Sequence, residues 1–437
     1  MRVLFVDQYA SCLFLILRAI DEGHDVRVWM PKANGVKTRI GEGFFKMIPD
    51  WKPHMKWADL ILTTGNDVIM RELTPFFNQN YPIFGCNPRS AQLELDRELG
   101  QKICQDYGIE TLPFEMFSSY KDAAAYVEKT QEVFVCKPWG GTEDKSLSYV
   151  SNSPEDMIWR LGKWEEKGKL KGSIILQKRV AGIEIAVGGW FGKGGWSRHI
   201  CENFEEKKLM NEGLGCNTGE QGTTLRYTTQ SKLFNQCLEP ITGYLHEIGY
   251  VGYVDQNCMV DTQGNAWPLE FTMRYGYPLL AIQEALHQGD SMQWRLDALQ
   301  GRDTLEVSSQ VAVGVVFTHG QYPYSKGTVE EDDGIPFYGM THSMEPQVQL
   351  WQARMGTAPV TIGNKIKEIP IVTSAGAIMA VVTGTGKTIH QAAEKAYNVA
   401  WKLKPPTNRM MRTDISKRLE KQLPELQKKG FATDLEY

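Results

Sequence analysis

Residues 249–278 constrain the fold more than any other stretch, because they form two strand-like segments joined by a turn. Val254, Cys258 and Val260 alternate with polar residues, and the same alternation returns after the turn-forming segment 261–265. Alternation of this kind over two adjacent segments predicts a β-hairpin. One face of the hairpin is expected to be apolar and the other polar.

The polar face of this hairpin carries the residues best suited to chemistry. If the loop closes at residues 262–263, Asp255 faces Glu270 directly, because facing residues in a hairpin keep a constant sum of numbers. Thr272 and Arg274 follow on the same face. Clustered oxygen ligands suit a Mg²⁺ shared with substrate phosphates, and a guanidinium suits a phosphoryl or carboxylate group. The alternative is a solvated strand face with a simple Glu–Arg pair.

Composition narrows the class of protein. The chain has 437 residues, enough for several domains, and a net charge of −4, which argues against nucleic-acid binding as the main function. We find no apolar run long enough for a membrane span and no export signal. The eight cysteines form no CxxC pair and no Cys/His cluster. We therefore expect a cytoplasmic protein with reduced, mostly buried thiols, as a monomer or homodimer.

The N-terminal segment alternates between apolar strands and helices. Strands are predicted at residues 2–6, 25–30, 58–63 and 81–84, and a helix at 11–22. This order predicts a parallel sheet with ligand sites at the strand ends. No G-x-G-x-x-G follows the first strand, where Gln8 and Tyr9 stand, and this counts against a dehydrogenase. Two further helices are expected, over residues 87–108 and 118–129.

Two lysines flank a glycine-containing loop in the next segment. A strand over residues 133–136 leads to Lys137, and Gly140 and Gly141 precede Lys145. Backbone N–H groups of such a loop can approach a polyphosphate closely while the ammonium groups neutralise its charge. The alternative is an exposed hairpin tip with ordinary surface lysines.

Two later segments also suggest ligand contacts. Residues 174–190 read as strand, bend and strand, so that Gln177 to Val180 could be a hinge whose backbone holds an adenine edge, with Glu184 taking ribose hydroxyls. A plain hairpin is the alternative. Residues 205–223 are polar and rich in glycine, and we expect a long loop there, either functional or disordered.

The sequence TGTGKT at residues 383–388 looks like a phosphate loop. That motif requires a glycine where Val381 stands. We therefore predict a tight turn between a strand and a helix over 387–402. Another strand is predicted over residues 310–318.

The order of these features resembles the ATP-grasp ligases and, within them, most closely the glycinamide ribonucleotide synthetase (phosphoribosylamine–glycine ligase) family. The resemblance runs nearly end to end. The segments that carry it are 84–88, 91–94, Lys137, Lys145, 207–208, 217–219, 269–278, 322–327 and 412–415.

Several positions depart from the family pattern. The changes at Gln8, Asn66 and Tyr277 lie where the family binds phosphoribosylamine and glycine, so they bear on the substrate pair more than on the chemistry. The other departures are Arg97 for a lysine, Gln177 for the hinge glutamate, and Thr272 for the asparagine of the metal strand.

The resemblance implies a multidomain α/β and α+β fold. A parallel α/β domain is expected over residues 1–112. A two-lobed ATP-grasp domain would follow, with its small lobe over 113–178 and its large lobe over 179–303. Residues 304–437 would form a C-terminal α+β domain with a basic tail.

The resemblance also implies an ADP-forming carboxylate–amine ligase that uses ATP and Mg²⁺ or Mn²⁺. ATP would convert a carboxylate into an acyl phosphate, which an amine then attacks. The implied roles are Arg97, Lys137, Lys145, Gln177, Val180 and Glu184 for ATP; Lys145 and Arg274 for catalysis; Glu270 with Asp255 or Thr272 for the metal; and Lys207, Asn217, Thr218, Gly219 and Arg412 for the substrates.

Three hypotheses follow from the sequence. The first is a ligase of altered specificity that joins a glycine-like amino acid to an amine-bearing small molecule, with nucleotide-like amines among the candidates. The second is a true phosphoribosylamine–glycine ligase of purine biosynthesis. The third is a non-catalytic nucleotide sensor on the same fold.

Overall fold

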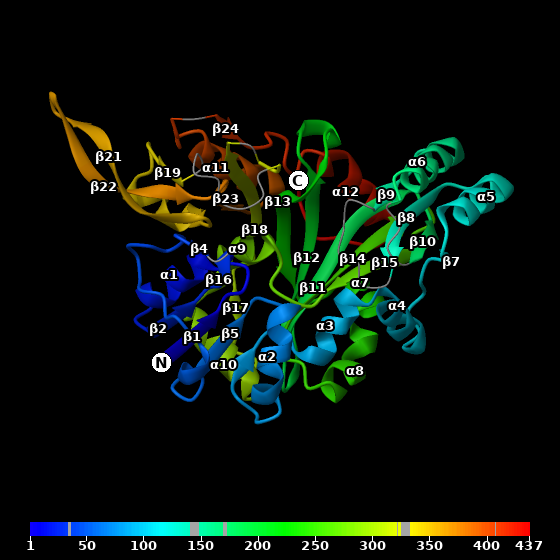
Figure 1. The fold of residues 1–437 in the computed structure, drawn as a ribbon, viewed down its shortest axis with the longest axis horizontal. Helices are drawn as coiled ribbons and strands as arrows, with labels where there is room; N and C mark the ends of the chain where they lie inside the picture. The colour runs from blue at the N-terminus through cyan, green and yellow to red at the C-terminus, as the bar shows by residue number, and fades with distance from the viewer. Residues whose placement is uncertain (34–35, 140–147, 169–172, 321, 325–332, 407) are drawn as a thin grey trace.

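The computed structural model of the chain shows an N-terminal domain, a small lobe and a large central sheet that continues into the C-terminal elements (Figure 1). The N-terminal domain and the small lobe lie at opposite sides of the central sheet in this view. The residues that the structure describes are 1–33, 36–139, 148–168, 173–320, 322–324, 333–406 and 408–437.

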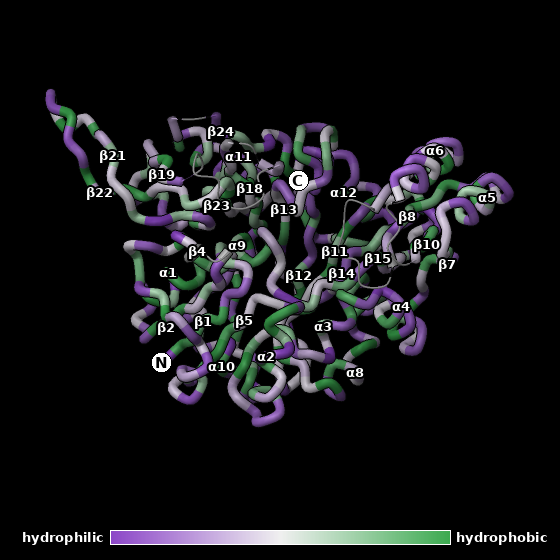
Figure 2. Tube along the Cα trace, viewed as in Figure 1, coloured by the Kyte–Doolittle hydropathy of each residue, from purple (hydrophilic) through white to green (hydrophobic). Residues whose placement is uncertain are grey.

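The N-terminal domain is built on a four-stranded parallel sheet, as predicted. Its strand order is β2-β1-β5-β6. The inner strands β1 and β5 are apolar and buried, which is the rule for parallel strands with both faces covered, and they appear as mostly hydrophobic segments in Figure 2. The edge strand β2 is only partly buried. The elements are β1 (Arg2–Val6), α1 (Leu13–Asp21), β2 (Asp25–Trp29), β3 (Lys32–Ala33), β4 (Val36–Lys37), β5 (Leu60–Thr63), α2 (Val68–Phe77) and β6 (Ile83–Phe84).

The single helix predicted over residues 87–108 is wrong. The structure has two helices there, α3 (Pro88–Leu95) and α4 (Arg97–Asp106), separated at Asp96. Asp96 has an extended backbone, and its side chain accepts hydrogen bonds from the N–H groups of Glu98 and Leu99. Asp96 therefore acts as an N-cap that starts a second helix.

The small lobe is a four-stranded antiparallel sheet in the order β7-β10-β8-β9, with two helices that pack on each other. Tyr120 and Trp164 from these helices share an apolar core with Leu176 of the sheet. Ser119 caps α5, the helix predicted over residues 118–129. The elements are β7 (Phe114–Phe117), α5 (Tyr120–Thr130), β8 (Phe134–Trp139), β9 (Tyr149–Val150), α6 (Pro154–Glu166) and β10 (Ser173–Lys178).

The central sheet has nine strands and joins the large lobe to the C-terminal elements. Its order is β15-β14-β11-β12-β13-β18-β23-β20, with β24 paired to β18. Strands from both sides of residues 303–304, where the sequence suggested a domain boundary, belong to this one sheet. Its strands are β11 (Gly182–Gly192), β12 (Gly195–Lys208), β13 (Asn217–Thr228), β14 (Gly252–Asp261), β15 (Ala266–Thr272), β18 (Val311–His319), β20 (Val348–Leu350), β23 (Ile378–Gly386) and β24 (Arg409–Met410).

The long loop predicted over residues 205–223 is mostly strand. β12 and β13 pair across this region, and only a short 3-10 turn, Asn211–Gly213, interrupts them. Several polar residues of this segment, among them Glu206, Glu220 and Thr223, are buried. Local composition therefore suggested a loop where long-range pairing makes a hairpin.

Other elements complete the C-terminal half. β21 and β22 form a long hairpin that extends away from the body in Figure 1. The remaining elements are α7 (Lys232–Cys237), α8 (Thr242–Glu247), α9 (Leu279–Glu284), β16 (His287–Gln288), α10 (Ser291–Leu299), β17 (Glu306–Val307), β19 (Asp333–Pro336), β21 (Ala353–Ile362), β22 (Lys365–Ala375), α11 (Ile389–Ala400) and α12 (Leu419–Lys428).

The TGTGKT segment connects a strand to a helix, as predicted, but residues 383–386 still belong to β23 and only Lys387 and Thr388 form the connection. β23 ends at Gly386, and Thr388 caps α11. A Cβ on Gly384 would lie 2.3 Å from the carbonyl oxygen of Ala392. The glycine is therefore needed for close packing of the helix on the strand.

All eight cysteines are free thiols, and all but Cys216 are buried. No helix among the described residues is both long and apolar enough to cross a bilayer.

A pair of glycine substitutions tests the packing of α11 against Gly384 of β23. Gly384→Ala should destabilise the protein by about 2–3 kcal/mol, because the new methyl group meets the backbone of α11. Gly162→Ala, in the exposed part of α6 with open space around it, should stabilise by about 0.5–1 kcal/mol. Thermal unfolding of both variants measures the difference; equal shifts would contradict the assigned packing.

Candidate active site

One face of the central sheet is polar although it is largely covered. We call it the site face, and on the opposite face Ile183, Ile185, Phe204 and Phe271 pack into the apolar core. The alternation predicted for the hairpin is thus present and extends to the neighbouring strands. The site face carries Glu184, Asn203, Glu205, Lys207, Asp255, Asn257, Glu270 and Thr272.

The predicted register of the β14–β15 hairpin is wrong. Asp255 faces Thr272, and Glu270 faces Asn257. The turn is longer than expected, because the side chain of Asp261 accepts hydrogen bonds from the N–H groups of Gln263 and Asn265. A bulge between Asn257 and Cys258 shifts the pairing further. Asp255 and Glu270 are therefore diagonal neighbours on one face.

Small residues on β11 make room for the side chains of Tyr253 and Asp255 on β14. Gly188 faces Asp255 across the strand pair, and Ala186 faces Asn257. A Cβ on Gly188 would lie 2.5 Å from Oδ1 of Asp255 and 2.1 Å from the hydroxyl of Tyr253. Gly188 is thus required by the buried side chains beside it.

The small lobe brings Lys137 to the site face. Lys137 lies on β8, and its Nζ donates a hydrogen bond of 2.9 Å to Oε1 of Gln177 on β10. Burial lowers the pKa of Lys137 to about 8, while the charges of Glu270 and Glu184 oppose that shift. The predicted lysine and two predicted carboxylates therefore interact across the two lobes.

Cations and carboxylates alternate around this point. Nη2 of Arg97 is 3.7 Å from Oε2 of Glu270. Nζ of Lys207 is 2.6 Å from Glu184 and 3.1 Å from Glu205. Although burial opposes its charge, Glu205, Glu184 and Glu270 raise the pKa of Lys207 well above its usual value.

Three carboxyl groups lie beside Lys207: Glu220 and Asp255 are buried, Glu205 is partly buried, and of the three only Asp255 was predicted as a site residue. We call Glu205, Glu220 and Asp255 the acid cluster. Oδ1 of Asp255 accepts hydrogen bonds from Nδ2 of Asn203 and from the Tyr253 hydroxyl, both at 3.1 Å. Burial raises the pKa of Asp255 to about 7, and Glu205 raises it further. Burial likewise raises the pKa of Glu220 well above its usual value.

The predicted substrate segment lies at the start of β13. The Thr218 hydroxyl donates a 2.9 Å hydrogen bond to the carbonyl of Lys207. Gly219 packs beneath Tyr277, whose ring would be 3.3 Å from an added Cβ. Asn217 is exposed at the strand end. These residues adjoin the acid cluster through Glu220, which follows Gly219 directly.

Arg274 lies between the large lobe and the N-terminal domain. Its Nη2 is 3.0 Å from Oε1 of Glu94, and its guanidinium lies 6.0 Å from the ring centre of Tyr9. Arg274 is thus on the hairpin, two residues beyond Thr272, but turned toward α3 and the end of β1.

The remaining predicted residues have three different outcomes. Val180 lies in the short connection between β10 and β11, where the hinge was expected. Lys145 lies outside the described residues. The structure does not bring Arg412 to the site face: its buried guanidinium binds Asp414 and the carbonyl of Lys208, with Glu206 3.3 Å away.

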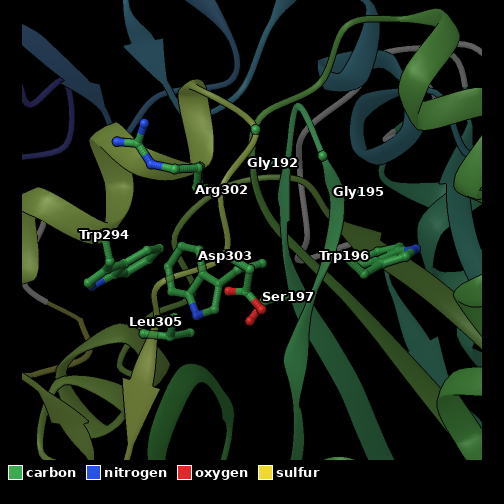
Figure 3. Close-up of a pocket in the computed structure, with 12 residues that line it drawn as sticks. Gly192, Gly195, Trp196, Ser197, Trp294, Arg302, Asp303 and Leu305 are labelled. Carbon is green, nitrogen blue, oxygen red and sulfur yellow. The ribbon is translucent and has the colours of Figure 1, made fainter.

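Figure 3 shows a hollow at the other end of the β11–β12 hairpin. Gly192, Gly195, Trp294 and Leu305 are among its lining residues. Asp303 accepts a hydrogen bond from the N–H of Arg198 there. Its described lining contains none of the predicted site residues.

The comparisons with known proteins agree with this geometry. Residues 96–279 match the family described as Phosphoribosylglycinamide synthetase, ATP-grasp (A) domain. This segment is an ATP-grasp domain. It includes the small lobe and most of the site face, from Arg97 to Tyr277.

Relatives and solved structures extend the likeness beyond that domain. A phosphoribosylamine–glycine ligase from Allochromatium vinosum is 24% identical over 361 residues, which cover 78% of this chain and 79% of the relative. The structure of the same ligase from Thermotoga maritima matches with a TM-score of 0.69 at 19% identity, over 95% of this chain and 100% of that one.

One similar structure contains a bound nucleotide. The biotin carboxylase domain of Hydrogenobacter thermophilus 2-oxoglutarate carboxylase, solved with Mg·ADP, ADP and bicarbonate, matches with a TM-score of 0.61 at 12% identity, over 93% of this chain and 90% of that domain. The ATP-grasp assignment and the multidomain α/β fold predicted from the sequence are confirmed. The comparisons support the expectation from the sequence of an ATP-grasp ligase of the ADP-forming, C–N bond-forming class.

The buried Asp255 carboxylate predicts an unusual pH dependence of stability. Its folded pKa of about 7 exceeds its unfolded value, so the folded state holds an extra proton between about pH 4 and 7. Its contribution to stability therefore falls as pH rises through that window and is constant above it. Asp255→Asn removes this pH-dependent loss of stability. In the free energy of unfolding, the substitution should therefore be more stabilising at pH 8 than at pH 5 by about 2–4 kcal/mol.

Chemical unfolding in EDTA at the two pH values measures this difference. The matched control is Asp261→Asn at the turn of the same hairpin. Hydrogen bonds from Trp267 and Asn265 outweigh burial and hold the pKa of Asp261 at about 2. The effect of Asp261→Asn on stability should therefore be the same at pH 5 and pH 8. An equal effect of Asp255→Asn at both values would contradict the buried position.

Proposed function

We propose that this protein is an ATP-dependent, ADP-forming ligase that activates the carboxylate of a glycine-like amino acid as an acyl phosphate and joins it to an amine-bearing small molecule. One observation carries the proposal. Lys137 of the small lobe interacts electrostatically with Glu270, Glu184 and Lys207 of the large lobe. Cations and carboxylates from two lobes thus surround one space, as binding of a triphosphate and its metal requires.

The nucleotide fits between the lobes. Lys137 would neutralise phosphate charge, and Arg97, 3.7 Å from Glu270, lies at the same place. Gln177 and Val180 would hold the base at the connection between β10 and β11, with Glu184 on the ribose. Lys145 belongs to the proposal from its place in the sequence.

The donors on the site face fit a divalent cation. Glu270 and Thr272 lie on β15, opposite Asn257 and Asp255. Oδ1 of Asn257 is buried without a hydrogen-bond partner among the described residues, which is the kind of oxygen that Mg²⁺ accepts. We propose Glu270, with Asn257, Thr272 or Asp255, as the metal ligands. A bound Mg²⁺ would neutralise charge on the phosphates.

The chain's own residues would then position the carboxylate. Arg274, held by Glu94, lies at the end of β15 and would stabilise the acyl phosphate through its guanidinium. Thr218 and Gly219 adjoin Lys207 and would orient the carboxylate substrate. Placement and charge neutralisation supply most of the catalysis expected for such a transfer.

The N-terminal domain favours an amine partner without a phosphate at the end of β1. Asp7 is buried there, and its carboxylate accepts hydrogen bonds from the N–H groups of Ser11 and Cys12 and from the Thr64 hydroxyl. These two amides stand at the start of α1, where a helix would otherwise bind an anion. A phosphate at this point would meet a carboxylate.

The neighbouring residues give the same indication. The Tyr9 hydroxyl donates to Oδ1 of Asn66 at 3.0 Å, and Gln8 is hydrogen-bonded to Asp67. These contacts occupy the positions at which the sequence departs from the phosphoribosylamine–glycine ligases. We therefore rank altered specificity first.

Phosphoribosylamine–glycine ligase activity is the second candidate. The names of the relatives favour it, since they match along most of this chain. ADP release measured with glycine and other amino acids, with and without phosphoribosylamine, separates the two. Nucleotide binding without turnover for any acceptor would favour a sensor instead.

Glu270→Gln should abolish ADP formation while the fold remains intact. Its side chain is 45% exposed, so the substitution costs little packing, but it removes the negative charge expected to bind the metal. Glu98→Gln, an exposed position on α4, is the control and should keep full activity. Turnover near that of the wild type in Glu270→Gln would show that the metal site is misplaced.

Nucleotide binding should take up a proton above pH 8. With a pKa of about 8, Lys137 is mostly neutral at pH 8.5, and phosphates beside it would restore its charge. Calorimetry in buffers of different ionisation enthalpy should therefore detect uptake of most of one proton at pH 8.5 and little at pH 7.

Two lysine variants test the source of this proton. Lys137→Met should remove the uptake and weaken Mg·ATP binding about tenfold or more. Lys178→Met, on the same lobe but paired to Glu132 at the surface, should change neither. Binding heats independent of buffer in the wild type at pH 8.5 would contradict the role given to Lys137.

A further inference from the structure

The acid cluster contains more carboxyl groups than the cations around it can pair. Glu206, on the opposite face of β12, is paired with both Arg412 and Arg418 at 3.3 and 2.8 Å. On the site face, the described cation that contacts the cluster is Lys207, and it is shared with Glu184. Ionising three carboxyl groups, two of them buried and one partly buried, beside one shared ammonium group is costly unless a further cation joins them.

Buried acceptors beside the cluster also lack donors. Oε1 of Glu220, Oδ1 of Asn203 and Oγ1 of Thr223 have no hydrogen-bond partner among the described residues. Each of the three side chains is at least nine-tenths buried. Thr223 faces Glu205 across β12 and β13, and Asn203 is hydrogen-bonded to Asp255. Buried acceptors without donors indicate a missing partner that donates hydrogen bonds.

We propose that the acid cluster is the subsite for a primary ammonium group of the amino-acid substrate. An ammonium group supplies one positive charge and three N–H donors, which suits the excess of carboxyl groups over cations and the three unpartnered oxygens. The inference rests on the proposed function and adds where the amino group of its amino-acid substrate binds.

The subsite lies in a position that suits such a molecule. Asp255 of the cluster faces Thr272 across neighbouring strands, and Arg274 is two residues further along β15. An amino acid with its ammonium group in the cluster can therefore direct its carboxylate toward the end of β15, where the acyl phosphate would form. Adjacent strands are about 4.8 Å apart, which is a span that a small amino acid covers.

The subsite would also control which amine reacts. An ammonium ion has no lone pair and cannot attack an acyl phosphate. Carboxylates around the substrate's own amino group keep it protonated, so the amide bond must form with an amine that arrives from elsewhere. The activated amino acid is thereby protected from joining to a second copy of itself at this position.

Binding to the full-length wild-type protein gives the first test. The Kd of each of the twenty amino acids is measured by calorimetry with and without saturating Mg·ADP, and the tightest binder is compared with its des-amino analogue, such as acetate for glycine. We expect the analogue to bind at least about tenfold more weakly. Equal binding of the analogue, or no amino-acid binding while Mg·ADP binds, would overturn the subsite.

Two glutamine variants then locate the effect. Glu220→Gln should weaken the same amino acid about tenfold or more, with Mg·ADP affinity within about twofold of the wild type. Glu212→Gln, exposed at the tip of the same hairpin, should change neither. Unchanged amino-acid binding in Glu220→Gln would overturn the proposal. If that variant does not fold, the wild-type comparison still decides.

Metal binding and nucleotide binding are measured on the same proteins. Loss of a bound Mn²⁺ in Glu220→Gln without loss of amino-acid affinity would show that the cluster holds a metal, which also overturns the proposal. Failure of the wild type to bind Mg·ADP would overturn the proposed ligase function, while amino-acid binding without nucleotide would still test the subsite.

Discussion

Burial of charge on one face of the central sheet is the constraint on which the rest of the structure depends. Lys137 comes from the small lobe, and Lys207 and the carboxylates around it come from the large lobe. Taking such groups out of water is costly, and close placement of opposite charges offsets part of that cost. The two lobes are therefore coupled through charge as well as through their chain connection. The shifted pKa values of Lys137 and Asp255 are consequences of this burial.

Much of this arrangement could be predicted from local sequence. Strands with clear apolar character, such as Arg2–Val6, and caps such as Ser119 depend on neighbours in the chain. The polar face of the β14–β15 hairpin was predicted for the same reason. Its register was not, because the Asp261 turn and the bulge after Asn257 both alter the pairing. Register depends on turn geometry that composition does not specify.

The acid cluster shows where local sequence gives no signal strong enough to decide. Glu205 and Glu220 lie in a segment whose glycines and charges suggested a loop, and their burial arises only when β12 pairs with β13 in the central sheet. A weak signal was nevertheless present: Phe204 alternates with Asn203 and Glu205, although Glu206, on the same face as Phe204, is charged. The glycine-rich turn that follows outweighed this alternation, so Glu220 was not considered as a site residue.

Two features at separate ends of the site now combine into one account of specificity. At the end of β1, Asp7 occupies the amides that would receive an anion. In the acid cluster, acceptors remain without donors among the described residues. The first feature disfavours a phosphate on the amine partner, and the second favours positive charge on the carboxylate partner. In the proposed ligase, both features would shift the electrostatic preference of the site away from anionic groups, while Lys137 and Arg97 would still offer positive charge to a triphosphate. A fold can therefore keep its nucleotide chemistry and change its substrates by altering charge at a few positions around the same sheet.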